Sequence, residues 1–347
     1  MDIRDLFGIR LPIIQAPMAG SQNHQLAAAV SMAGGLGSIP AGMLSADSLD
    51  AELSAMTALT DRPYNLNFFC HRPPAVEPER EQAWLELLAP FLREHQIDPA
   101  NIPGGATRKP FDAAMAEVVE RYRPAVVSFH FGLPAPALLQ RVRANGAKIL
   151  SSATTLEEGR WLQTQGVDAV IAQGLEAGGH RGMFLSTDID GQVGTLALLP
   201  QLVAALELPV IAAGGIADER GVAAAQALGA AGVQVGTAYL LCDESRASPL
   251  HRQALQSPGA ENTVLTTLFS GRPARGMINR LIRELGPRPD AVPPFPLAGN
   301  AIGALRAQAE HLGIDDFSPL WAGQNVSGCR AVPAAQLTEA LAAGWRR

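Results

Sequence analysis

One segment of the chain combines glycines with two side chains that can do polar chemistry. Residues 176–182 read Glu-Ala-Gly-Gly-His-Arg-Gly and directly follow an apolar run at 169–173. The glycines let the backbone pass close to a flat ligand, because no Cβ stands in the way. An unperturbed histidine has a pKa near neutrality, so His180 is expected to act as a general base or as a positive partner for an anionic substrate. The sequence predicts His180 as the catalytic residue and Arg181 as a structural or phosphate-neighbouring cation.

Two more glycine loops lie further along the chain. Gly214-Gly215 follows one apolar run, and Gly236-Thr237 ends the next. Backbone N–H groups that no side chain shields, close to a helix N-terminus, are suited to bind an anion. A tight turn explains either loop taken alone. The two loops together predict a phosphate site, although they do not say which phosphate.

Three further residues are candidates for lining a substrate pocket, namely His71, Phe129 and His130. Each follows or ends an apolar run, as the residues of the glycine loops do. We predict no metal site, because the chain has no H-x-x-x-H pair, no paired acidic cluster and no Cys/His spacing typical of metal ligands. A hydrolase nucleophile is also not indicated, because Gly-x-Ser-x-Gly is absent.

Eight short apolar runs recur along the chain and alternate with segments of helical periodicity. Most of the runs are continuously apolar, as is typical of strands buried on both faces of a parallel sheet. Eight strands that alternate with helices predict an α/β protein with a (β/α)8 TIM barrel, whose active site lies at the carboxyl ends of the strands. The predicted strands cover residues 12–16, 36–40, 64–69, 125–131, 148–152, 169–173, 209–213 and 232–236.

An open sheet of six parallel strands is the main alternative fold. It would be expected to carry G-x-G-x-x-G after its first strand. The nearest match begins at Gly35 and Gly37, but Pro40 takes the place of the third glycine. The barrel is therefore favoured.

Two regions break the alternation of strands and helices. Residues 73–123 are rich in Pro, Glu and Arg and predict a helical excursion from the barrel. Residues after the last strand carry helical patterns around a proline-rich stretch. We therefore predict a barrel over residues 1–245, a smaller and mainly helical cap or substrate domain over 246–300, and C-terminal helices over 301–347 that close on the barrel.

Composition excludes several classes of protein. The 347 residues carry a formal net charge of −6, which argues against nucleic acid as a partner. The chain has no uninterrupted run of 18 apolar residues, so no membrane span is predicted. The N-terminus lacks the apolar segment of a secretory signal. Three scattered cysteines, Cys70, Cys242 and Cys329, do not form a disulfide framework, so a cytoplasmic location is expected. The sequence leaves open whether the protein is a monomer or a homodimer.

Several segments, taken together, carry a family resemblance over nearly the whole chain. The chain resembles the class I nitronate monooxygenases, formerly called 2-nitropropane dioxygenases. The matching segments are QAPMAG at 15–20, YNLNFFCH at 64–71, VIAQGLEAGGHRG at 170–182, PVIAAGGI at 209–216, GVQVGT at 232–237, SGRPARG at 270–276 and WAGQ at 321–324.

The resemblance implies an FMN-dependent enzyme in which His180 takes the place of the family's active-site histidine. The implied reaction is oxidative denitrification of an alkyl nitronate such as propionate 3-nitronate. It consumes O2, passes through a flavosemiquinone and yields a carbonyl product and nitrite. The FMN contacts that the resemblance implies are Ala16, Pro17, Met18, Asn67, Gln173, Gly178, Gly214, Gly215, Gln234, Val235, Gly236 and Thr237.

Other functions remain open from the residues alone. An FMN-dependent NAD(P)H:quinone or enoyl-thioester reductase would share the glycine loops, although no motif in this chain indicates a nicotinamide site. A flavin-free phosphate-binding lyase or isomerase is a second possibility. A protein that binds or stores FMN without turnover is a third. The colour of the purified protein and its response to nitronate and to NADH distinguish these functions.

Overall fold

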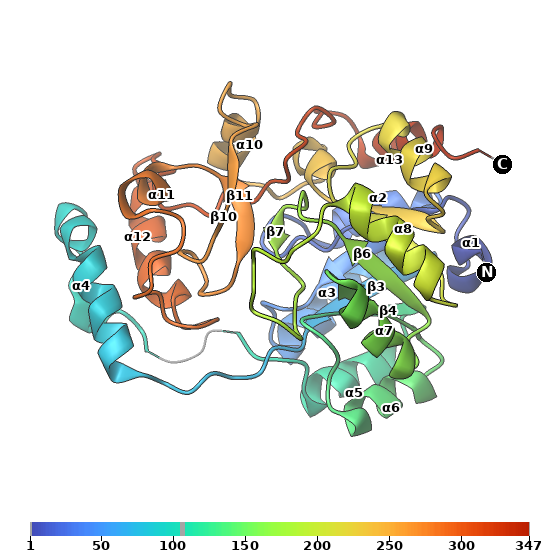
Figure 1. Ribbon diagram of the computed structural model, residues 1–347, viewed down its shortest axis with the longest axis horizontal. Coiled ribbons are helices and arrows are strands. Elements are labelled where there is room, and N and C mark those ends of the chain that lie inside the picture. Colours follow the sequence, from blue (N-terminus) through green and yellow to red (C-terminus); the bar gives the residue numbers. More distant parts are fainter. Residues whose placement is uncertain (1, 105–107, 347) are drawn as a thin grey trace.

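A closed barrel of eight parallel strands forms the larger of two lobes in the computed structural model, which describes residues 2–104 and 108–346 (Figure 1). The strands follow the order β1-β9-β8-β6-β5-β4-β3-β2, and backbone hydrogen bonds between Leu36 and residues 13 and 15 join the two end strands. The predicted barrel and its eight strands are thus confirmed. The strands are β1 (Ile13–Gln15), β2 (Gly37–Pro40), β3 (Tyr64–Phe69), β4 (Val126–His130), β5 (Lys148–Ala153), β6 (Ala169–Gln173), β8 (Val210–Ala213) and β9 (Gly232–Val235).

Side chains along each strand alternate between the barrel interior and the surrounding helices. One apolar cluster closes the amino end of the barrel and includes Ile14, Val126 and Ile211, with Ile3 and Phe7 of helix α1 (Ile3–Phe7). A larger cluster lies between strands and helices. The helices that surround the barrel are α2 (His24–Met32), α3 (Ala46–Leu59), α5 (Ala113–Tyr122), α6 (Pro136–Ala144), α7 (Leu156–Thr164), α8 (Thr195–Ala205), α9 (Glu219–Ala227) and α13 (Ala334–Ala342).

The smaller lobe lies to the left of the barrel in Figure 1. It contains a three-stranded antiparallel sheet in the order β10-β11-β7, which the sequence analysis did not predict for a mainly helical cap. These strands are too short for an alternating pattern to stand out in the sequence. The elements of this lobe are α4 (Pro78–Glu94), β7 (Gly179–His180), α10 (Pro249–Leu255), β10 (Thr263–Thr266), β11 (Ala274–Met277), α11 (Arg280–Leu285) and α12 (Gly299–His311); 3₁₀ turns lie at η1 (Pro99–Asn101) and η2 (Thr237–Leu241).

Helix packing divides the chain differently from the predicted domain bounds. Helix α12 packs against α4 around an apolar core that includes Trp84, Leu88 and Leu305, so it belongs to the smaller lobe and does not close on the barrel. Helix α13 packs against α2 and α9 of the barrel, and α5 packs against α3 and α6. The excursion at 73–123 is therefore shared between the lobes, because α4 and α5 bury their apolar faces in different cores.

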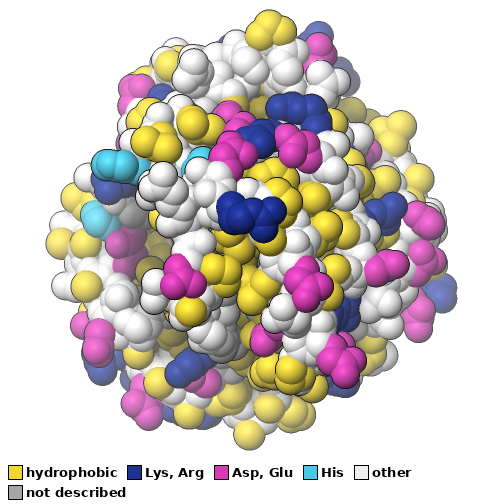
Figure 2. Space-filling model, turned by 90° about the vertical axis from the view of Figure 1, so that its left-hand side faces the viewer, with side chains coloured by type: hydrophobic (Ala, Val, Ile, Leu, Met, Phe, Trp, Pro, Cys, Tyr) yellow, Lys and Arg dark blue, Asp and Glu magenta, His cyan; other side chains and the backbone are white. Residues whose placement is uncertain are grey.

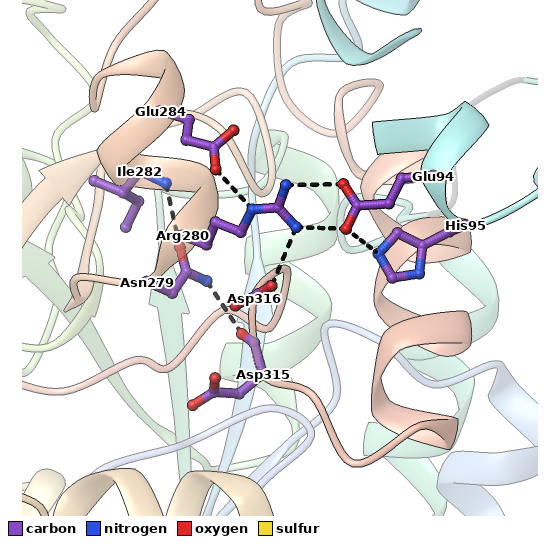
Figure 3. Close-up of polar contacts among 8 residues, drawn as sticks. All are labelled: Glu94, His95, Asn279, Arg280, Ile282, Glu284, Asp315 and Asp316. Carbon is purple, nitrogen blue, oxygen red and sulfur yellow. Dashed lines mark hydrogen bonds and ion pairs between the residues drawn. The ribbon is translucent and has the colours of Figure 1, made fainter. Parts of the chain in front are cut away.

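A polar cluster fixes α4 to the smaller lobe (Figure 3). The guanidinium of Arg280 donates to both carboxylate oxygens of Glu94, at 2.7 and 2.8 Å, and to Glu284 at 2.6 Å. Asn279 caps α11 through its side-chain oxygen and donates its side-chain N–H to the carbonyl oxygens of Asp315 and Ser318. The outer face of this lobe carries acidic, basic and apolar side chains interspersed (Figure 2), so its charges form no broad basic surface there.

Candidate active site

A cavity lies at the carboxyl ends of the barrel strands, with residues of the smaller lobe at its edge. It brings together loops that are far apart in the sequence, as expected for the fold. His180 lines this cavity together with His130. Of the predicted cofactor contacts, those that line it are Ala16, Pro17, Met18, Asn67, Gln173, Gly178, Gly214, Gly215, Gln234, Gly236 and Thr237.

Three predicted site residues do not line the cavity. Phe129 is fully buried and packs against Phe68 and Phe111 on the helix-facing side of β4, because its neighbours Ser128 and His130 occupy the inward positions. His71 is buried but is not part of the cavity lining, and its ring lies 4.7 Å from that of Phe295. The side chain of Val235 lies in the outer core, although its carbonyl oxygen accepts the N–H of Ala16 at 2.8 Å.

The backbone of the 214–215 loop has a form that favours glycine, and the space around Gly236 is restricted. Gly214 and Gly215 have φ values of +114° and +73°, in the region that L side chains rarely occupy. A Cβ on Gly214 would also lie 2.9 Å from the Oγ1 of Thr195. At Gly236, a Cβ would meet Ala16 at 3.3 Å. These positions leave backbone N–H groups accessible to an anion in the cavity.

Amide side chains at the cavity wall differ in how fully they are hydrogen bonded. Gln173 accepts the N–H of Gly182 at 2.7 Å and donates to the carbonyl of His180 at 3.0 Å, so it holds the loop that carries His180. Asn67 donates to Ser128. In contrast, the Oε1 atom of Gln234 is buried and has no hydrogen-bond partner among the described residues. A buried acceptor without a donor is costly, which points to a ligand donor at this position.

His180 lies in an aromatic surrounding formed by both lobes. Its ring centre is 5.9 Å from that of Phe131, 5.5 Å from that of Phe295 and 5.7 Å from that of Trp321. Burial lowers the pKa of His180 well below its usual value, and the positive charge of Arg108 lowers it further. The imidazole is therefore neutral at neutral pH, which favours a base over a permanently positive partner.

His130 supports the same loop from the neighbouring strand. Its Nε2 atom lies 3.2 Å from the carbonyl oxygen of His180, and its Nδ1 atom lies 3.1 Å from the Oγ of Ser152. Because a carbonyl only accepts, Nε2 carries the proton and Nδ1 accepts from the serine hydroxyl. Burial lowers the pKa of His130 to about 4, so this ring also stays neutral.

Arg181 stabilises the backbone where the loop that carries His180 leaves β6. It is completely buried and donates to the carbonyl oxygens of Gly174 at 2.6 Å and Gln173 at 2.8 Å, and to the side chain of Gln192 at 2.9 Å. Burial lowers its pKa to about 10, which leaves it charged at neutral pH. Its role is structural, since it does not line the cavity.

The sequence analysis missed several residues of the site. Arg108 comes from the excursion between α4 and α5, and Phe69 and Trp321 come from the end of β3 and the chain before α13. Ser270 and Phe295 reach His180 from the smaller lobe. Phe69 ends a barrel strand, whereas the docking of the two lobes brings Ser270 and Phe295 to His180, so no local motif marks their roles. Of this group, Phe69, Ser270 and Trp321 lay in segments that carried the family resemblance, whereas Arg108 and Phe295 did not.

No group of three or more His, Cys, Asp or Glu side chains within residues 2–104 and 108–346 is arranged to hold a metal ion. Over the same residues, no helix has the length and apolar character needed to span a membrane.

The matching family model and the curated relatives name the same family. The family model described as nitronate monooxygenase matches residues 2–344. A nitronate monooxygenase of Pseudomonas aeruginosa is 45% identical over 97% of this chain and 96% of its own. The crystal structure of a nitroalkane oxidase from Streptomyces ansochromogenes has a TM-score of 0.88 and 40% identity, covering 99% of this chain and 97% of that chain. A structure of FabK from Thermotoga maritima has a TM-score of 0.70 and 28% identity, covering 99% and 94%. The chain therefore belongs to the nitronate monooxygenase family of oxidoreductases.

Proposed function

We propose that this protein is an FMN-dependent nitronate monooxygenase that oxidises an alkyl nitronate with O2 and releases a carbonyl compound and nitrite among its products. The observation that carries this proposal is the placement of the glycine loops and His180 around one cavity. A flat, phosphorylated cofactor would fill such a cavity with its phosphate on the backbone N–H groups. The proposal extends the family membership to this chain's own cofactor and substrate.

The residues present fit FMN. Gly214, Gly215, Gly236 and Thr237 would hold the phosphate. The unpaired Oε1 of Gln234 would accept a hydrogen bond from the ligand, and Asn67 would lie at the polar edge of the ring. When bound, FMN would supply the electron transfer between nitronate and O2.

The chain's own side chains would bind and orient the substrate. The rings of Phe131, Phe295 and Trp321 around His180 would exclude water and strengthen electrostatic interactions in the site. No described residue hydrogen bonds the Nδ1 atom of His180, so this atom can take a proton from a neutral nitroalkane. An anionic nitronate needs no such deprotonation.

Propionate 3-nitronate is the substrate we propose first, because the resemblance implied it. We propose the cytoplasm as the location, where the free thiols of Cys70, Cys242 and Cys329 would stay reduced. Nitrite release, O2 consumption and H2O2 formation with this substrate would be measured together, and nitrite release with O2 consumption but without free H2O2 would support a monooxygenase.

A visible spectrum of the purified protein tests the cofactor and the reaction class together. We expect a yellow protein whose flavin absorbance falls when ethyl nitronate is added without O2, in the absence of NAD(P)H. NADH serves as the comparison, because an NAD(P)H-dependent reductase of similar fold would be bleached by NADH. A colourless, fully folded protein, or bleaching by NADH and not by nitronate, would contradict the proposal.

A further inference from the structure

Arg108 is the one formally charged side chain among the described residues that line the cavity. No aspartate, glutamate or lysine is among those residues. The other lining groups are glycines, uncharged polar side chains, two histidines and apolar side chains. An anion that enters this cavity therefore meets a single fixed positive charge, and the position of that charge can select among anions.

Arg108 lies on the side of the cavity that holds His180. Its guanidinium carbon lies 5.5 Å from the centre of the Phe295 ring. The same ring lies 5.5 Å from the ring of His180. Stacking on an aromatic ring orients the planar fork of a guanidinium while its N–H groups remain available. The ring of Phe295 thus lies next to both His180 and the guanidinium of Arg108.

The charge of Arg108 is not neutralised within the described chain. No carboxylate in residues 2–104 or 108–346 pairs with it, whereas its neighbour Arg306 is paired with Glu310 at 2.7 Å. Arg272 donates instead to the carbonyl of Met183 and lies over the ring of Phe131 at 4.0 Å. A partly desolvated cation without a counterion is unfavourable, and an anionic ligand group at this position would offset that cost.

We propose that Arg108 is a specificity-determining residue that binds a second anionic group of the substrate, remote from the nitronate carbon. The proposal rests on the proposed function and names the side chain that would select nitronates with a carboxylate over nitronates with an uncharged tail. The nitronate group would lie near His180, and the carboxylate would form a bidentate contact with the guanidinium. Nitronates with an uncharged tail would lack this contact.

Two pairs of ligands test the effect of the charge on the tail, because the members of each pair differ only in a carboxylate or a methyl group. Propionate 3-nitronate is compared with propyl-1-nitronate, in which a methyl group replaces the carboxylate. In parallel, 3-nitropropionate and 1-nitropropane are titrated into the flavin-loaded protein, and binding is followed by the change in flavin absorbance. The titration requires binding only, so it tests the role of Arg108 even if neither nitronate is turned over. Absence of turnover with both nitronates would contradict the proposed function and not the role of Arg108.

Arg108→Gln is the informative variant. We expect about 10- to 100-fold weaker binding of 3-nitropropionate and a similar loss in kcat/KM for propionate 3-nitronate, as for the loss of a charge-assisted hydrogen bond. Binding of 1-nitropropane and turnover of propyl-1-nitronate should change less than about threefold. Arg108→Lys keeps the charge without the fork, so its loss should be intermediate.

Lys109→Gln is the matched control, because Lys109 is the exposed neighbour of Arg108 and does not line the cavity. It should leave both ligand pairs unchanged. Two results would overturn the proposal. In one, Arg108→Gln weakens the charged and uncharged ligands equally, which would place the guanidinium at the nitro group they share. In the other, the variant changes neither.

Discussion

The Nε2 atom of His180 lies 2.8 Å from the Oγ atom of Ser270, and the same Oγ atom lies 3.3 Å from the carbonyl oxygen of Arg272. A hydroxyl has one hydrogen, and a carbonyl can only accept it. Ser270 therefore donates to Arg272 and accepts from His180, which places the imidazole proton on Nε2. The lone pair of Nδ1 is then left for substrate chemistry.

Ser270→Ala should lower kcat/KM for a neutral nitroalkane by roughly three- to tenfold, which corresponds to one lost hydrogen bond. Without the hydroxyl the imidazole is free to adopt either tautomer, so the pH profile of kcat/KM should change as well. Ser270→Thr keeps the hydroxyl and should restore most of the activity. Equal activity of the alanine variant over the whole pH range would contradict this positioning role.

His180→Asn should retain FMN but lose activity at low substrate concentration. The shorter amide would lose the contacts by which the imidazole binds and orients the substrate, so kcat/KM for a nitronate should fall about 10- to 100-fold. Flavin content per chain, measured from the absorbance of the denatured protein, checks that the cofactor site is intact. Unchanged steady-state kinetics with nitronate would argue against a catalytic role for His180.

Gly214→Ala should weaken FMN binding by roughly tenfold or more. The added Cβ would be strained at φ +114° and would lie 2.9 Å from the Thr195 hydroxyl. Gly146→Ala is the matched control, because Gly146 also has a positive φ of +83° but no atom lies within 4 Å of its Cβ position. Both variants should lose stability, and only Gly214→Ala should release flavin on dialysis. Equal flavin retention would exclude a phosphate site at this loop.

Arg181→Met should be strongly destabilising, by about 3–5 kcal/mol, because it leaves buried carbonyl oxygens without donors. Urea unfolding would give the change in the free energy of unfolding. Arg220→Met is the comparison, since the Arg220 side chain is 84% exposed, and its effect should stay within about 1 kcal/mol. If the two variants were equally stable, Arg181 would not support the loop.

Stability should fall as the pH is lowered from 7 to 5, and His251 should contribute to this fall. Burial lowers the pKa of His251 to about 4, and its Nε2 donates to the carbonyl of Trp321 at 3.1 Å. The unfolded chain, with an ordinary histidine pKa near 6.5, binds more protons than the folded protein between pH 6.5 and 4. The contribution of His251 is therefore fully present above about pH 6.5 and is lost as the pH falls.

His251→Gln should reduce the loss of unfolding free energy between pH 7 and 5 by about 2 kcal/mol. This is the loss expected from one histidine whose pKa is about 4 in the folded protein and near 6.5 in the unfolded chain. His311→Gln, which removes an exposed histidine at the end of α12, is the matched control. Thermal unfolding at a series of pH values gives the slope of stability against pH for each variant. A slope that is identical in the wild type and in His251→Gln would contradict the assignment.

The sequence by itself determined the barrel and the position of its glycine loops. Continuously apolar runs separated by helical periods are a local property, and the glycines at 214 and 215 are required by the backbone φ values that the loop adopts. The glycines that we propose to bind the phosphate also mark where β8 and β9 end. The predictions for His180 and for most of the cofactor contacts relied on such local patterns and on the family segments.

The tertiary structure alone decided which neighbouring residues face the cavity and how the lobes share the chain. Because both faces of a barrel strand are apolar, the composition of β4 did not show that His130 points inward and Phe129 outward. The docking of the smaller lobe brings Ser270, Phe295 and Arg108 to His180, over separations that no local pattern records. Burial then sets the neutral charge of His180, since desolvation depends on everything packed around the ring.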